Sequence, residues 1–174
     1  MTDESQQGRR NFLRAAAGLG SAALGLLLAL PGASYVVDPL LRASGKKGRW
    51  LPVAELEGLE EEHPVSVSVV GEQRDAWTRA PQRKLGMVWL RKKGEQVVAF
   101  NAECPHLGCK VGYDRDQKHF ACPCHESAFN QDGDVQGGPA PRSLDPLETR
   151  VVDGKVEVRF VRFRAQTAER VEIG

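Results

Sequence analysis

The sequence lacks an excess of charge of either sign. It holds 24 Lys and Arg against 23 Asp and Glu, a formal net charge of +1. A protein that binds nucleic acid normally carries a basic excess, so we expect no nucleic-acid partner. Most of the chain also lacks long helical periodicity, while 18 Gly and 10 Pro supply many turns. The 174 residues therefore predict a small domain built from short β-strands.

Charged side chains are absent from Ala15 to Val37. A helix of that length, rising about 1.5 Å per residue, crosses a hydrocarbon core of roughly 30 Å. The preceding stretch, Arg9-Arg10-Asn11-Phe12-Leu13, resembles a twin-arginine export signal. The alternative is the ordinary basic flank of a membrane segment. We expect residues 1–14 to be a cytoplasmic N-terminus with this signal, and 15–37 to be a transmembrane anchor.

The anchor is expected to be retained, because Pro31-Gly32-Ala33 is a poor version of a signal cleavage site. Residues 38–49 are polar and are interpreted as a tether, the alternative being an ordered loop. Their basic residues do not fit the positive-inside rule, so the export signal alone predicts the orientation. The prediction is a single-pass protein of the bacterial inner membrane, with its head, residues 50–174, on the periplasmic side.

Short strands are predicted throughout the head. Val65–Val69 alternates between apolar and polar residues, the pattern of a half-buried strand. Met87–Leu90 and Gln96–Phe100 are two further strands joined at Lys93-Gly94-Glu95. Asp153-Gly154, flanked by the stretches 149–152 and 155–160, is the strongest hairpin signal in the chain. These patterns predict an all-β head of antiparallel strands, and none assigns a role to residues 161–174.

Cysteine is missing everywhere except between Cys104 and Cys124, and the histidines His106 and His125 lie within or directly after this stretch. Cys104 and His106 are separated by one residue, and Cys122 and His125 by two. Two short loops thus each offer one thiolate and one imidazole. A tetrahedral zinc ion accepts such a set. A [2Fe–2S] cluster also accepts it, with the thiolates on one iron and the imidazoles on the other.

The two loops together resemble the cluster-binding boxes of the Rieske iron–sulfur proteins, in the branch that contains a disulfide. The matching sequences are Cys104-Pro105-His106-Leu107-Gly108-Cys109 and Cys122-Pro123-Cys124-His125-Glu126-Ser127. The resemblance implies a Rieske-type antiparallel β head with a cluster-binding subdomain at about 102–142. It implies one [2Fe–2S] cluster, with Cys104, His106, Cys122 and His125 as ligands. It also implies a disulfide between Cys109 and Cys124, which needs an oxidising compartment.

Further cluster-binding residues follow from the resemblance. Leu107 is implied to shield the cluster, and Gly138-Pro139-Ala140-Pro141 to be the proline-rich loop that covers it. Ser127 is implied to donate its hydroxyl to a bridging sulfide. Many quinol-oxidising relatives have Gly in place of Glu126 and Tyr in place of Phe129. Since Phe129 lacks a hydroxyl, we expect a potential below the top of the range of roughly −150 to +300 mV.

The implied function is one-electron transfer by the iron–sulfur subunit of a cytochrome bc-type quinol–cytochrome c reductase, without independent activity. His106 or His125 would accept a proton and an electron from quinol beside a cytochrome b-type subunit. A c-type cytochrome would receive the electron, and membrane lipid would surround the anchor. The alternative is the Rieske small subunit of a periplasmic molybdenum oxidoreductase such as arsenite oxidase. A ring-dioxygenase component is disfavoured, because those proteins usually lack the Cys109/Cys124 pair and an anchor.

Overall fold

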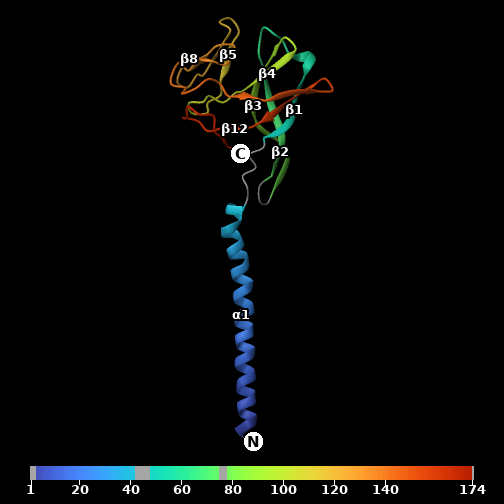
Figure 1. The fold of residues 1–174 in the computed structure, drawn as a ribbon, viewed down its shortest axis with the longest axis vertical. Helices are drawn as coiled ribbons and strands as arrows, with labels where there is room; N and C mark the ends of the chain where they lie inside the picture. The colour runs from blue at the N-terminus through green and yellow to red at the C-terminus, as the bar shows by residue number, and fades with distance from the viewer. Residues whose placement is uncertain (1–2, 42–47, 75–77, 174) are drawn as a thin grey trace. The chain divides into compact units, whose positions relative to one another are not determined.

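The structure is a computed structural model that describes residues 3–41, 48–74 and 78–173 (Figure 1). It divides into two compact units, one on each side of residue 44. The first holds helix α1, Asp3–Leu41, whose segment Gln6–Val37 is long and apolar enough to cross a membrane. Half of the predicted tether, residues 42–47 of 38–49, lies outside the described residues, so the domain boundaries stay predictions.

The second unit is built on two antiparallel sheets. One has the order β1-β11-β10, and the other has the order β2-β3-β4-β9. The two hairpins predicted from the sequence are confirmed, since β3 pairs with β4 and β10 pairs with β11. Gly94, Asp153 and Gly154 lie in the turns between these strands and all have positive φ. The bounds are β1 Arg49–Glu55, β2 Val65–Arg74, β3 Arg79–Lys93, β4 Gln96–Asn101, β9 Pro146–Leu147, β10 Thr149–Val152 and β11 Lys155–Phe160, with a 3-10 turn at Leu56–Gly58.

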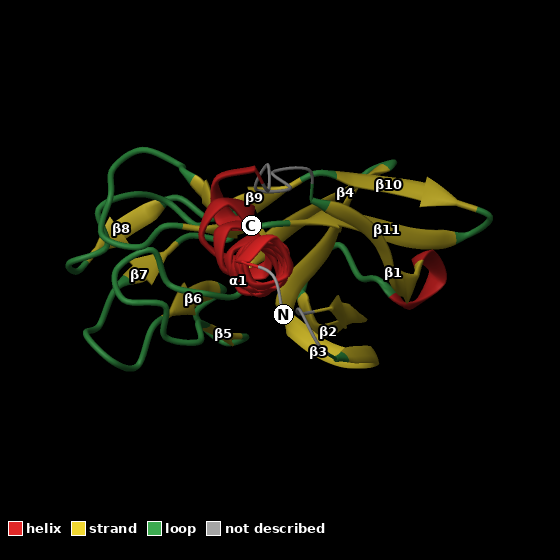
Figure 2. Ribbon diagram, turned by 90° about the horizontal axis from the view of Figure 1, so that it is seen from below, coloured by secondary structure: helices red, strands yellow, loops and turns green. Residues whose placement is uncertain are grey.

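A third, smaller sheet with the order β5-β6-β7-β8 carries the cysteine-rich loops at one end of the head (Figure 2). Its strands are β5 Gly112–Asp114, β6 His119–Ala121, β7 Ala128–Phe129 and β8 Val135–Gly137. A last pair, β12 Arg162–Phe163 and β13 Glu172–Ile173, closes the chain. The predicted fold class, an antiparallel β head preceded by one long apolar helix, is confirmed.

Two hydrophobic cores stabilise the head. The first is formed mainly by residues of the two larger sheets, among them Val88, Leu90, Val156 and Val158. The second contains both free cysteines and lies under the small sheet. Its buried members are Phe100, Cys104, Val111, Phe120, Cys122, Phe129, Ala140 and Leu144. Trp89 packs against it and donates its indole N–H to the Val111 carbonyl at 3.0 Å. The cysteine loops are therefore held by a packed core of their own.

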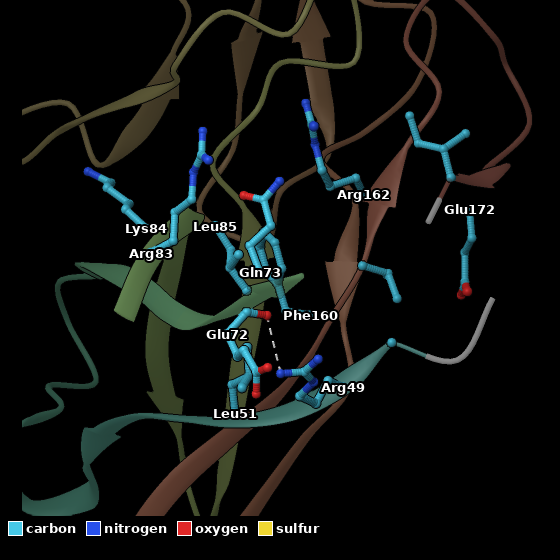
Figure 3. A pocket seen from close by; sticks show the side chains of 13 residues that line it. Arg49, Leu51, Glu72, Gln73, Arg83, Lys84, Leu85, Phe160, Arg162 and Glu172 are labelled. Atoms are coloured by element: carbon cyan, nitrogen blue, oxygen red, sulfur yellow. Dashed lines mark hydrogen bonds between the residues drawn. The ribbon is translucent and has the colours of Figure 1, made fainter. Parts of the chain in front are cut away.

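A hollow of about 530 Å³ lies elsewhere on the head, between β1, β2, β3 and the end of the chain (Figure 3). Arg49 donates to the Glu72 carbonyl across it at 3.3 Å. Among the described residues that line it there is no cysteine and no histidine. Its chemistry is therefore unlike that of a thiolate-bound metal centre.

Candidate metal centre

The two cysteine-rich loops have the same backbone hydrogen bonds. In the first loop, Cys104 N–H donates to the Cys109 carbonyl and Gly108 N–H donates to the Cys104 carbonyl, both at 2.8 Å. In the second loop, Cys122 N–H donates to the Ser127 carbonyl at 2.8 Å, and Glu126 N–H to the Cys122 carbonyl at 3.1 Å. Each loop is thus a tight turn that begins at a free cysteine.

The shared geometry makes Glu126 a strained residue. The fifth residue of each loop has positive φ, which is +77° at Gly108 and +58° at Glu126. A left-handed conformation costs a residue with a Cβ roughly 1–2 kcal/mol. The second loop therefore holds a strained residue beside His125, and its other hydrogen bonds keep it in place.

Cys104 and Cys122 are free thiols, and their side chains are only 1% and 3% exposed. Burial raises the pKa of the Cys104 thiol, and so does its contact with the Cys122 thiol. The His106 backbone N–H and the Ser127 hydroxyl act on this pKa in the opposite direction. The two thiols are therefore neighbours in a dry environment, where bound metal would displace their protons and stabilise the thiolates.

His106 and His125 lie together at the tips of the two loops. Their ring centroids are 4.7 Å apart, with an angle of 85° between the ring planes. His125 is exposed and His106 is half-buried. Nδ1 of His106 is buried and has no hydrogen-bond partner among the described residues. A buried polar atom without a partner is costly, and a metal ion would satisfy it. The residues present therefore fit a centre with two sulfur and two nitrogen ligands.

The predicted disulfide is present and joins Cys109 to Cys124, 15 residues apart in the sequence. It connects the two loops directly. The Sγ atoms of Cys109, Cys122 and Cys124 all lie within 4.8 Å of one another. Because two of these three sulfurs are bonded to each other, Cys122 is the free thiol of that group. The full assignment of four ligands stays a prediction from the sequence.

The proline-rich segment, residues 138–141, packs on the second loop. Ala140 N–H donates to Ser127 Oγ at 3.2 Å, and Ser127 is 1% exposed. Since Oγ accepts this bond, the Ser127 hydroxyl keeps its own proton for donation to a sulfur. Pro139 is exposed beside it, and Leu107 is half-exposed on the first loop. The shielding role of Leu107 stays a prediction.

Gly138 explains how this covering segment comes so close. Its φ is +87°, and a Cβ there would lie 2.5 Å from Ser127 Cα and 2.8 Å from the Glu126 carbonyl oxygen. Both atoms belong to backbone, which moves only with the whole loop. The approach of the covering segment therefore requires glycine at this position.

Gly138→Ala is expected to lower the free energy of unfolding by about 2–4 kcal/mol, since overpacking adds to the strain of positive φ. Gly137→Ala is the matched control, because a Cβ at Gly137 meets nothing within 4 Å. Its expected effect is within about 0.5 kcal/mol. Urea unfolding of both variants measures the difference. Equal midpoints for the two would contradict this account of the covering segment.

Comparison with known proteins agrees with the geometry of the site. Residues 49–152 match a family model described as the Rieske [2Fe–2S] domain. The menaquinol:cytochrome c reductase iron-sulfur subunit of Bacillus subtilis is 33% identical over 151 residues, covering 84% of this chain and 87% of the relative. The cytochrome b6-f complex iron-sulfur subunit of Desmonostoc sp. is 33% identical over 161 residues, covering 88% and 85%.

A solved structure, the cyanobacterial plasma membrane Rieske protein PetC3 from Synechocystis PCC 6803, is 28% identical with a TM-score of 0.38. It covers 52% of this chain, and 84% of the solved chain is covered. The family model spans more than half of this sequence, and both relatives named above match over most of its length. The chain belongs to the family of Rieske [2Fe–2S] proteins.

Proposed function

We propose that this chain is the iron–sulfur subunit of a cytochrome bc-type quinol–cytochrome c reductase, with a menaquinol as the quinol. The pair of imidazoles at the loop tips carries the proposal, because one of them is exposed to an incoming donor. The names of the relatives support it, since they are subunits of a menaquinol:cytochrome c reductase and of a cytochrome b6-f complex.

When bound, the [2Fe–2S] cluster supplies the uptake and release of one electron. Cys104 and Cys122, buried in the second core, would hold it together with His106 and His125, whose rings lie next to each other at the loop tips. A quinol loses protons together with electrons, and imidazole is a base that accepts a proton near neutral pH. The outer ring nitrogen of exposed His125 is therefore the suited proton acceptor. Ser127 is buried and accepts a hydrogen bond from Ala140 of the covering segment.

The chain acts in this proposal as one part of an oxidoreductase complex. A cytochrome b-type subunit would form the quinol site against the loop tips, and a c-type cytochrome would receive the electron. Half-exposed Leu107 stands next to His106 at that surface and suits an apolar contact there.

The membrane arrangement is part of the same proposal. Residues 1–14 would carry the twin-arginine signal in the cytoplasm, 15–37 would cross the bacterial inner membrane, and 38–49 would tether the head, 50–174, on the outer side. The apolar helix α1 supports the anchor. The Cys109–Cys124 disulfide supports an oxidising compartment for the cluster-binding subdomain at about 102–142.

Phe129→Tyr is expected to raise the midpoint potential, because a hydroxyl that donates to a ligand sulfur favours the more negative reduced state. Phe129 is fully buried in the core that contains Cys104 and Cys122. Phe120→Tyr is the control, since its ring packs on Trp89, Phe100 and Tyr113. Redox titration followed by electron paramagnetic resonance (EPR) compares them. The absence of an upward shift in Phe129→Tyr would refute the argument.

Gentle detergent extraction of the full chain, followed by identification of the copurifying cofactors, tests the function itself. We expect b-type haem in the complex, and reduction of the cluster when a menaquinol analogue is added. Molybdopterin in place of haem would overturn the proposal in favour of a molybdenum oxidoreductase.

A further inference from the structure

The C-terminal segment, defined here as residues 161–173, forms a closed loop. Its two ends pair as β12 and β13, with Arg162 opposite Ile173 and Phe163 opposite Glu172. Inside the loop, Arg164 N–H donates to the Val171 carbonyl at 2.9 Å, and the Thr167 hydroxyl donates to the Glu169 carbonyl at 2.8 Å. The C-terminal segment thus has hydrogen bonds of its own that fix its shape.

One contact of the segment is to the first cysteine loop. Gln166 N–H donates to the Pro105 carbonyl at 2.9 Å, and Gln166 has a φ of +62° that directs this N–H. Pro105 lies between Cys104 and His106, and its carbonyl belongs to the peptide bond that precedes His106. The hydrogen bond therefore holds that peptide bond in place. Nearby, Arg162 and Glu103 approach to 3.5 Å. The C-terminal segment therefore contacts the residues on both sides of Cys104.

The second contact of the C-terminal segment is to Arg142, the residue that directly follows the covering segment. Buried Arg142 follows Pro141 and makes a two-pronged bond to buried Asp145, with Nε–Oδ1 at 2.8 Å and Nη2–Oδ2 at 2.7 Å. Its remaining nitrogen, Nη1, donates to the Thr167 carbonyl. Arg170 approaches Asp145 at 3.3 Å. A buried charge pair holds its geometry only when its other hydrogen bonds are satisfied, and Thr167 supplies one of them.

We propose that the C-terminal segment is a positioning element for the cluster, with Gln166 and Arg142 as its positioning residues. Three links then close a ring around the centre. The disulfide joins the two cysteine loops, Ser127 joins the second loop to the covering segment, and the C-terminal segment joins that segment back to the first loop. This third link orients the Pro105–His106 peptide and limits the entry of water, whichever protein is the redox partner.

Two substitutions at Gln166 isolate the third link. Both remove the same side chain. Gln166→Gly keeps the N–H and accepts the φ of +62°. Gln166→Pro has no N–H, and its ring fixes φ near −65°. On incubation of the loaded, full-length protein with a chelator, we expect the proline variant to lose its visible absorbance about tenfold faster than wild type. Tenfold corresponds to about 1.4 kcal/mol. The glycine variant should stay within about twofold of wild type.

Two further readouts separate positioning from a merely structural role. The midpoint potential of Gln166→Pro should rise, because water that reaches the cluster stabilises the negative charge of the reduced state. Amide hydrogen exchange should quicken at 104–109 and at 138–145 in the proline variant and not in the glycine variant. A chain truncated after Arg164 keeps Val161 and Phe163 on the first core and should behave like the proline variant. Equal loss rates and potentials for the two Gln166 variants, or wild-type values after truncation, would overturn the proposal.

Discussion

Replacing Cys122 by serine is expected to leave the protein without its cluster. The Cys122 thiol is buried beside Cys104 and lies within 4.8 Å of the disulfide sulfurs. Serine has nearly the same shape but offers a hard, largely protonated oxygen where iron–sulfur centres need a thiolate. The expected loss is essentially complete, and Cys104→Ser should give the same result. Iron and acid-labile sulfide content, together with the EPR spectrum of the reduced protein, measure it.

The double variant Cys109→Ala, Cys124→Ala is the control for this experiment. This variant removes one cysteine from each of the two loops, both of them from the disulfide, and leaves both free thiols and both imidazoles. We expect it to bind iron in measurable amount, with faster loss on dilution. A full cluster in Cys122→Ser would contradict the division of the cysteines into two ligands and one disulfide. Zinc instead of iron in the wild-type protein would contradict the cluster itself.

Local sequence patterns were enough to predict the hairpins and, through the resemblance of the two cysteine boxes to a known family, the Cys109–Cys124 disulfide. Asp153-Gly154 adopts positive φ at both residues because the turn depends on the residues within it. The two loops that each begin at a free cysteine were implied by the resemblance of their sequences to the Rieske boxes. A box of six residues is contiguous in the sequence, so its residue types and their spacing can be recognised without knowledge of the fold.

Contacts between distant residues were not predictable in the same way. Nothing in the sequence around Arg142 indicated that it would pair with Asp145 inside the protein and reach Thr167, 25 residues further on. No periodicity marked Gln166 as a donor to Pro105. The burial of Phe129 with both free cysteines depends on three strands that meet only in the fold. A charged residue directly after a proline-rich loop is the weak signal that could have pointed to Arg142.

The double variant Cys109→Ala, Cys124→Ala is also expected to lower the free energy of unfolding of the cluster-free protein by about 3 kcal/mol. A disulfide restricts the unfolded chain, and a loop of about 15 residues corresponds to that magnitude. The Cys109–Cys124 bond closes such a loop. Urea unfolding of the cluster-free wild type and the double variant gives the difference, and reduction of the wild type should reproduce it.

The same comparison in the loaded protein should give a difference at least as large. The cluster binds the folded chain and not the unfolded one, so its binding adds to the free energy of unfolding. The disulfide joins the two loops that carry the implied ligands, so the double variant should bind the cluster less tightly and gain less from it. Cys122→Ser, which retains the disulfide, should unfold in urea close to the cluster-free wild type. A clearly smaller difference in the loaded protein than in the cluster-free protein would mean that the cluster stays bound to the unfolded chain and restrains it as the disulfide does.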